Sequence, residues 1–208
     1  MKRSDNFKEG RQVTFAGKAE DAWQDTGKTV QEQENLHDEI MKQLLKDMGL
    51  EEGETMEFPY LVRGAQLCCT CGTHKRKLNL PLCHGVYIEK NPAVHEEDCK
   101  VGDDGNIAAF GICESEGHPV HAPGRKGEYK KIMLVSEEDG SNIKGYACTP
   151  CIVGTWKDVH ETKKIIRNHT DGTAEGDKLS ALTLESFLVC AYGGLIQPMT
   201  SGQDEKEE

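Results

Sequence analysis

The sequence predicts a mainly β domain built from short hairpins, preceded by an N-terminal extension that contains one amphipathic α-helix. Two observations carry this prediction. From residue 58 onward, short β-prone runs alternate with closely spaced turn signals, and no second helical period follows. Before that point, apolar residues recur at three-to-four spacing in one segment only. We therefore divide the chain into an extension over residues 1–57, a β domain over 58–203 and an acidic tail over 204–208.

The extension is expected to be irregular over residues 1–28 and helical over about 29–48. Thr29 and Glu32 form a possible capping box, and the helix is expected to end near Gly49. The apolar stripe of this helix consists of Leu36, Ile40, Met41, Leu44, Leu45 and Met48. A stripe of this kind packs on its own domain more often than on another protein, so we expect the first arrangement.

The β domain contains four β-prone runs, at residues 60–62, 85–88, 132–135 and 165–166. Clusters of turn-forming residues occur at 104–106, 139–141 and 171–173. Short runs with turns at this spacing favour many small hairpins over one large regular sheet.

Composition and charge restrict the possible functions. With 36% hydrophobic and 6% aromatic residues, the chain is poor in core-building side chains and needs metal, cross-links or partners to hold one structure. A formal net charge of -11 argues against nucleic-acid binding, which requires a concentrated basic face. The short basic run from Lys75 to Lys77 is more typical of a solvated turn or strand edge.

No apolar stretch suits a signal peptide or a membrane span, so we expect neither.

The cysteines and histidines predict a metal site. All nine cysteines and seven of the eight histidines lie in the β domain. Without an oxidising compartment, thiols are better interpreted as metal ligands or redox sites than as disulfides. Four spacings could each supply half of a tetrahedral zinc site: Cys69 with Cys71, Cys71 with His74, Cys113 with His118 and His121, and Cys148 with Cys151. Their density predicts at least one bound transition metal, with zinc as the first candidate, and leaves the ligand set open.

Two enzymatic interpretations compete with a structural metal. The run Cys148-Thr149-Pro150-Cys151 is similar to the thioredoxin motif, in which the first thiolate attacks disulfides at a helix N-terminus. That arrangement needs a helix after the motif, and residues 152–156 are poor helix-starting material. A small thiol–disulfide oxidoreductase using Cys148 and Cys151 therefore remains the alternative function and not the first one. A zinc deaminase would need H-x-E followed by P-C-x-x-C, but Gly154 stands where the last ligand should be. We therefore predict no catalytic residues, and we interpret His95 as a surface residue in an acidic loop.

The order of short motifs in the β domain resembles the PAAR-like proteins encoded with contractile injection and type VI secretion machines. The matching segments lie at residues 60–65 with 67–68, 106–107 with 110–113 and 119, 148–150 with 156, and 186–196 with 202–203. They cover roughly Pro59 to Gln203, and their ordered combination is more specific than any one of them.

This resemblance implies a compact cone of short β-hairpins, without enzymatic activity, that caps and sharpens a trimeric spike. The cysteines at the family-motif positions are Cys68, Cys113, Cys148 and Cys190, so these four are expected to hold a structural zinc closed to solvent. Better-known members use three histidines and one cysteine. His118 and His121, beside Cys113, are therefore alternative ligands, and Cys151 is the first alternative among the thiols.

The resemblance also implies partners and a location. The expected partner is a trimeric (VgrG-like) spike protein that carries one cone. One chain that contacts three identical chains requires an internally repeated base, and the similar sequences at residues 67–72 and 189–194 are consistent with such a repeat. The protein is expected to assemble in the bacterial cytoplasm, without a signal peptide, and to be delivered outward with the spike. The extension has no counterpart in the family and is expected to brace the cone or to recruit an effector or adaptor. Extra thiols at Cys69, Cys71, Cys83 and Cys99 leave room for a second metal.

Overall fold

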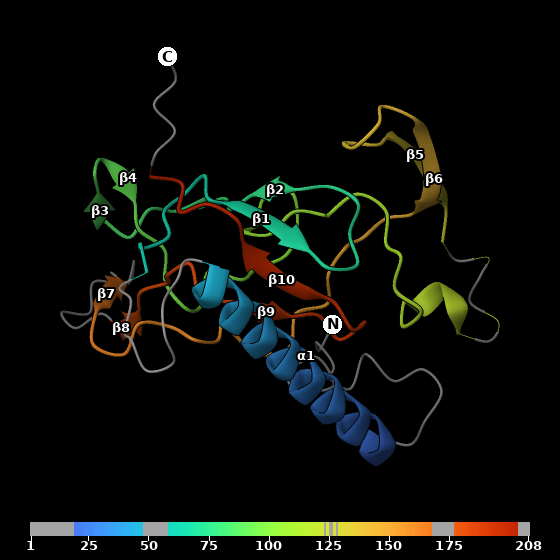
Figure 1. Cartoon of the computed structure of the whole chain (residues 1–208), viewed down its shortest axis with the longest axis horizontal. Coiled ribbons are helices and arrows are strands. Elements are labelled where there is room, and N and C mark those ends of the chain that lie inside the picture. Colours follow the sequence, from blue (N-terminus) through green and yellow to red (C-terminus); the bar gives the residue numbers. More distant parts are fainter. Residues whose placement is uncertain are drawn as a thin grey trace, which may run out of the picture.

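The computed structural model describes residues 19–47, 58–122, 124, 127, 129–167 and 177–203, and this part is mainly β with a single N-terminal helix (Figure 1). The helix is α1 (Ala19–Asp47), and a short 3-10 helix, η3, spans Pro119–His121. The strands are β1 (Gln66–Cys69), β2 (Arg76–Lys77), β3 (Tyr87–Ile88), β4 (Asn91–Pro92), β5 (Lys131–Val135), β6 (Asn142–Tyr146), β7 (Lys164–Arg167), β8 (Asp177–Ser180), β9 (Leu188–Val189) and β10 (Leu195–Pro198). The predicted fold class is confirmed.

A four-stranded antiparallel sheet lies at the centre, in the order β2-β1-β10-β9. In Figure 1, β1 runs beside the red β10, although the two strands come from opposite ends of the β domain. Leu67 pairs with Pro198 and Cys69 with Ile196. The central sheet thus ties the beginning of the β domain to its end.

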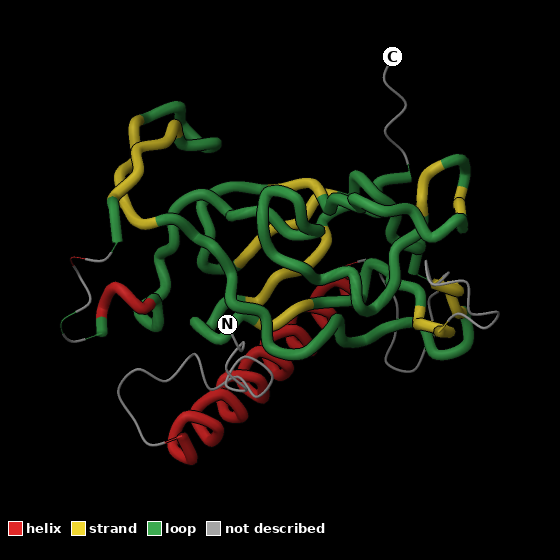
Figure 2. Tube along the Cα trace, turned by 180° about the vertical axis from the view of Figure 1, so that it is seen from behind, coloured by secondary structure: helices red, strands yellow, loops and turns green. Residues whose placement is uncertain are grey.

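Three separate hairpins surround this sheet: β3–β4, β5–β6 and β7–β8. The β5–β6 hairpin projects at one end of the molecule and the other two lie at the opposite end, with long loops between them (Figure 2). The runs predicted near residues 87, 133 and 165 all lie in these hairpins, whereas Tyr60 and Val62 form isolated bridges. The predicted turn at 139–141 joins β5 to β6, with Gly140 at a positive φ of 71°; the one predicted at 171–173 lies outside the described residues.

Alternate residues of a strand point to opposite sides of the sheet, and in β9 and the first half of β10 the residues on both sides are buried. Leu188 and Ile196 belong to the main core, together with Phe110 and Trp156. Their sequence neighbours Val189 and Leu195 face the other way and pack with Phe187. That second face is covered by α1.

The helix docks through Val30, Leu36 and Ile40, which pack against the cluster of Phe187, Val189 and Leu195. An ion pair of 2.6 Å between Lys157 Nζ and Glu34 Oε1 supports this contact. The predicted packing of the apolar stripe on its own domain is therefore confirmed for Leu36 and Ile40.

The helix begins earlier than the sequence predicts, at Ala19 instead of Thr29. The expectation of irregular structure was wrong for residues 19–28, and the proposed capping box of Thr29 and Glu32 lies within the helix. These residues lack the three-to-four apolar spacing on which the prediction depended, but they include good helix formers, so propensity accounts for the earlier start. Met48 and Gly49 lie outside the described residues.

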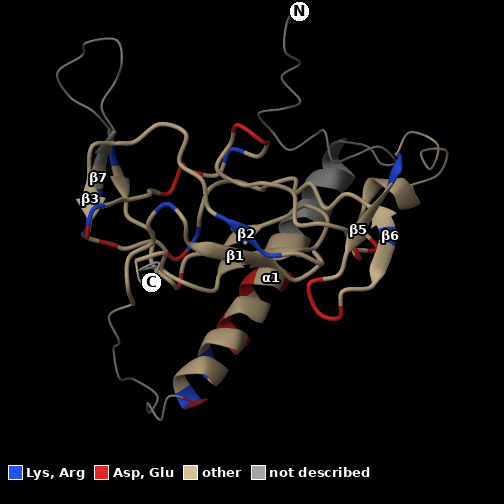
Figure 3. Ribbon diagram, turned by 90° about the horizontal axis from the view of Figure 1, so that it is seen from above, with Lys and Arg blue, Asp and Glu red and all other residues tan. Residues whose placement is uncertain are grey.

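The basic run at Lys75–Lys77 lies largely on β2, the edge strand of the central sheet, as the sequence predicts (Figure 3). Arg76 is engaged within the protein, since its Nε donates to Ala109 O at 2.8 Å and its Nη1 lies 3.6 Å from Glu137 Oε1. Among the described residues, no helix combines the length and apolar character that a membrane crossing requires.

Candidate metal centre

Four loop segments that are distant in sequence converge around the thiols: residues 69–73, 110–114, 146–152 and 190–194. Isolated β-bridges join Gly72 to Cys113, Ile112 to Ala147 and Ile152 to Cys190. Backbone hydrogen bonds lie between the same segments: Glu114 N donates to Cys71 O at 2.9 Å, Cys113 N to Tyr146 O at 2.8 Å and Ala191 N to Cys151 O at 2.8 Å. The backbone alone therefore brings several cysteines to one region.

Cys69, Cys113 and Cys148 form the centre of this region, and we call these three residues the thiol cluster. The interaction with the Cys148 thiol lowers the pKa of Cys69 and lowers the pKa of Cys113 to about 7. The same interactions raise the pKa of Cys148, whose Sγ donates to Cys71 O at 3.9 Å. Cys113 thus reaches the thiolate form, the form that binds metal ions, near neutral pH.

Two glycines make room for these sulfurs. A Cβ atom at Gly194 would lie 2.9 Å from Cys69 Sγ. At Gly72 it would lie 2.5 Å from Phe110 Cβ and 3.3 Å from Cys148 Sγ. The thiol cluster therefore depends on the absence of a side chain at both positions.

Cys190 and Cys71 border the thiol cluster. Cys190 is buried, which raises the pKa of its thiol to about 12, and its Sγ accepts a hydrogen bond of 3.4 Å from Cys151 N. Cys71 Sγ donates to Gly193 O at 3.8 Å, and burial raises its pKa as well. Of the four predicted ligands, Cys113 and Cys148 belong to the thiol cluster, and Cys190 lies near its third member, Cys69.

Cys68 is the predicted ligand that the structure does not bring to this group. Along β1 the burial alternates, so Leu67 and Cys69 point into the core while Cys68 points to the other face. Its Sγ donates to Gln197 O at 3.7 Å. The motif resemblance favoured Cys68, but strand alternation gives its inward position to Cys69. The apolar residue two positions earlier, Leu67, is the signal that identifies the inward thiol.

Two of the three alternative ligands, His118 and Cys151, line an open cavity of about 840 Å³ together with Tyr146 and Tyr192. The His118 ring lies among aromatic rings, with centroids 6.0 Å from Tyr146 and 5.8 Å from Tyr192. Its Nδ1 accepts a hydrogen bond from Val120 N at 3.2 Å and so caps η3, the turn that includes His121. In the described part of the chain, no three thiols and no set of three mixing thiols with imidazoles lie within 4.8 Å of one another.

Two groups of histidine and aspartate do meet this spacing and could hold a metal ion: His84 with His95 and Asp98, and His37 with Asp38 and Asp158. The sequence analysis missed both. It interpreted His95 as a surface residue, which was wrong, because its exposed fraction is 2%. The available signal was the spacing His95-x-x-Asp98, which places both side chains on one tight turn.

Comparison with known proteins gives one match. The family model described as a domain of unknown function (DUF4280) matches residues 61–203. No curated protein and no solved structure matches the chain. The matched range includes the thiol cluster and His84, His95 and Asp98, and it begins after α1.

Proposed function

Because the chain belongs to the family described as a domain of unknown function (DUF4280), and because its motif order resembles PAAR-like proteins, we propose that it is a non-enzymatic spike-tip protein. It caps the trimeric (VgrG-like) spike of a bacterial contractile injection or type VI secretion machine. The observation that supports this proposal most is the convergence of four loop segments on buried thiols, in a domain of short strands.

A spike tip must resist compression when the spike is driven through a membrane. Loops with little regular structure resist deformation poorly unless cross-links hold them, and a metal can supply such cross-links without a large core. Here the cross-link would join segments that are already paired through the bridges of Gly72, Ile112 and Ile152. Cross-linking at this point would stiffen most of the loop framework at once.

A structural zinc is part of the proposal. The chemistry of the donors suits this ion, since soft thiolates favour it, and the sulfurs would have to draw together on binding, because no three of the described thiols lie within 4.8 Å of one another. We assign it to Cys69, Cys113 and Cys148, with Cys190 beside them, so that Cys69 replaces the originally predicted Cys68. Zinc would supply bonds that tie these segments together. Cys148, whose pKa is raised and whose Sγ donates to Cys71 O at 3.9 Å in the metal-free chain, would lose its proton on binding.

Two observations favour the tip over a thiol–disulfide oxidoreductase. After Cys151 the chain does not enter a helix, since Ile152 forms a β-bridge with Cys190. In addition, Cys148 is 5% exposed and its pKa is raised, whereas an attacking thiol needs exposure and a lowered pKa.

The proposed contact with an effector or adaptor follows from where the N-terminal extension lies. The middle of α1 braces the central sheet through Leu36 and Ile40. Beyond this contact the helix continues past the body, and Leu44 is 43% exposed (Figure 3). We assign any contact with an effector or adaptor to this end of α1. Assembly would take place in the bacterial cytoplasm, before delivery outward with the spike.

Co-purification with the trimeric spike protein from the same bacterium tests the proposal. We expect one copy of this chain per spike trimer. The Leu44→Ser variant should still bind the trimer, because Leu44 belongs to the proposed contact with an effector or adaptor and not to the contact with the spike. Failure to co-purify with a correctly assembled trimer would contradict the tip function. Turnover in an insulin-reduction assay, lost in Cys148→Ser, would support the oxidoreductase in its place.

A further inference from the structure

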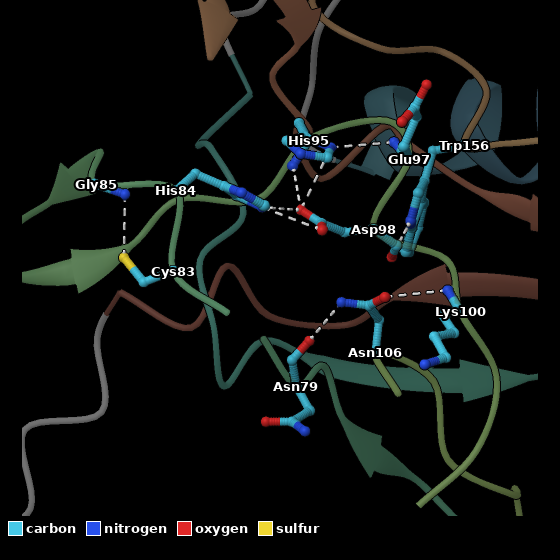
Figure 4. Close-up of polar contacts among 10 residues, drawn as sticks. All are labelled: Asn79, Cys83, His84, Gly85, His95, Glu97, Asp98, Lys100, Asn106 and Trp156. Carbon is cyan, nitrogen blue, oxygen red and sulfur yellow. Dashed lines mark hydrogen bonds and ion pairs between the residues drawn. The ribbon is translucent and has the colours of Figure 1, made fainter. Parts of the chain in front are cut away.

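A second cluster of metal-ligating side chains lies outside the thiol cluster, beside the β3–β4 hairpin. Asp98 is its hub (Figure 4). His84 Nε2 lies 2.9 Å from Asp98 Oδ2 and 3.1 Å from Oδ1. His95 Nδ1 lies 3.5 Å from the same Oδ2. All three side chains are more than nine-tenths buried, with 8% of His84, 2% of His95 and 8% of Asp98 exposed.

His95 and Asp98 are fixed to each other before any ligand arrives. They lie on one turn, in which Asp98 N donates to His95 O at 2.9 Å and His95 N donates to Asp98 Oδ2 at 2.8 Å. The indole of Trp156 anchors this turn, because its Nε1 donates to Asp98 O at 2.9 Å. Outer hydrogen bonds of this kind orient metal ligands and reduce the ordering cost of binding.

His84 reaches the turn from a different segment, the exposed loop that leads into β3 (Tyr87–Ile88). Its imidazole lies against that of His95, with ring centroids 4.0 Å apart. Cys83 is not part of the group, since its Sγ accepts a hydrogen bond from Gly85 N at 3.3 Å. The contacts of His84 with Asp98 and His95 therefore join this loop to the turn.

The spacing matches that of ligands around one ion. Two nitrogen or oxygen ligands about 2 Å from a tetrahedral zinc lie about 3.3 Å apart. The distances from Asp98 Oδ2 to the two imidazole nitrogens, 2.9 Å and 3.5 Å, fall on either side of that value. A simple ion pair would account for His84 with Asp98, but it gives no reason for a second imidazole at the same oxygen.

The hydrogen bonds also indicate which nitrogen atoms can bind. His95 Nδ1 accepts from Glu97 N at 3.2 Å, so it is unprotonated, and a metal would take its lone pair in place of this hydrogen bond. His84 Nε2 faces both carboxylate oxygens of Asp98 and donates its proton to them. A metal would displace this proton and take its place between the two side chains.

We propose that His84, His95 and Asp98 form a sulfur-free site for a divalent transition metal of the zinc type, separate from the thiol cluster. Two imidazoles and one carboxylate suit such an ion, and a water completes its tetrahedron. The consequence is mechanical: the ion pins the loop of His84, and with it the β3–β4 hairpin, to the turn anchored by Trp156.

Titration of the metal-free full chain with Co²⁺ tests this site, because thiolate ligands add intense sulfur-to-metal absorption that nitrogen and oxygen ligands do not. We expect one Co²⁺ equivalent whose spectrum lacks this absorption. It should disappear in His84→Gln and Asp98→Asn and persist in His37→Gln, which removes the histidine of the other histidine–aspartate group. The proposal is overturned if all bound Co²⁺ shows sulfur absorption, or if His84→Gln keeps the sulfur-free equivalent.

A second measurement on the unmodified chain covers the case in which these variants do not fold. Hydrogen exchange of the backbone amides over residues 84–93 is compared with and without Zn²⁺. The outer part of the β5–β6 hairpin, residues 134–143, is the internal reference, because the backbone hydrogen bond between this hairpin and a thiol-bearing segment lies at its base, at Tyr146. Zn²⁺ is expected to slow exchange at least tenfold in the first segment and to leave the reference unchanged. Equal exchange in both conditions would show that these three side chains form an ion pair without a metal.

Discussion

His37 of α1 stacks on Phe187 of the β domain, with ring centroids 4.0 Å apart and an angle of 25° between the ring planes. The exposed fraction of His37 is 2%. The pair therefore seals the junction between the helix and the central sheet, and it places a titratable group inside that junction.

The helix junction is predicted to weaken in mild acid. Burial lowers the pKa of His37 below its usual 6.5, although Asp158, Asp38 and a backbone hydrogen bond to Glu185 oppose the shift. Because the unfolded chain then binds the proton more tightly, the stability from neutral His37 is complete above pH 6.5 and is lost as pH falls through the lowered pKa. Urea unfolding between pH 8 and pH 5, with His37→Gln as the variant, measures this. A pH slope that stays the same in the variant would exclude His37 as its source.

The apolar contact of α1 can be tested with two substitutions on one helix. Ile40→Ala removes part of the packing on Phe187 and Leu195 and is expected to lower the free energy of unfolding by about 1–2 kcal/mol. Leu44→Ala, at a position that is 43% exposed, is the matched control and should change it by less than about 0.5 kcal/mol. Equal effects in urea unfolding would mean that the helix does not dock as described.

The space that Gly194 leaves beside the thiol cluster is predicted to matter for stability and zinc binding as the thiols do. In Gly194→Ala the new methyl group would press on Cys69 Sγ, so we expect a loss of about 1–3 kcal/mol of stability and weaker zinc binding. Gly127→Ala is the control, because a Cβ atom there meets nothing within 4 Å. Thermal unfolding and zinc titration of both variants check this. Unchanged zinc affinity in Gly194→Ala would place the ion elsewhere.

The thiols of the metal-free chain are predicted to differ in reactivity. Cys113, with a pKa of about 7, should react with iodoacetamide much faster at pH 7.5 than Cys190, whose pKa is about 12. Zinc should protect Cys113. Peptide mass spectrometry after timed alkylation measures the rates at Cys113 and Cys190. Equal rates would contradict the pKa difference between them, and with it the effect of Cys148 on Cys113.

The sequence predicts local features of this fold well because they depend on neighbouring residues. The hairpin around Gly140 follows from a turn cluster just after the β-prone run at residues 132–135, and the docking face of α1 follows from the spacing of Leu36 and Ile40. The metal ligands depend instead on pairing between distant segments. Whether Cys68 or Cys69 faces inward is decided by the register of β1 against β10, and a shift of one residue exchanges them. His84 and His95 meet only because the turn at Asp98 lies beside the β3–β4 hairpin.

The most direct test of the central claim, a rigid tip held together by metal at the thiol cluster, is metal analysis of the purified protein with thermal unfolding of the same samples. Wild type is compared with Cys113→Ser, Cys148→Ser and the control Cys68→Ser. We predict stoichiometric zinc in wild type and Cys68→Ser, and a joint loss of about one zinc and several degrees of thermal stability in the other two variants. Zinc content and stability that are equal in all four proteins would contradict the claim.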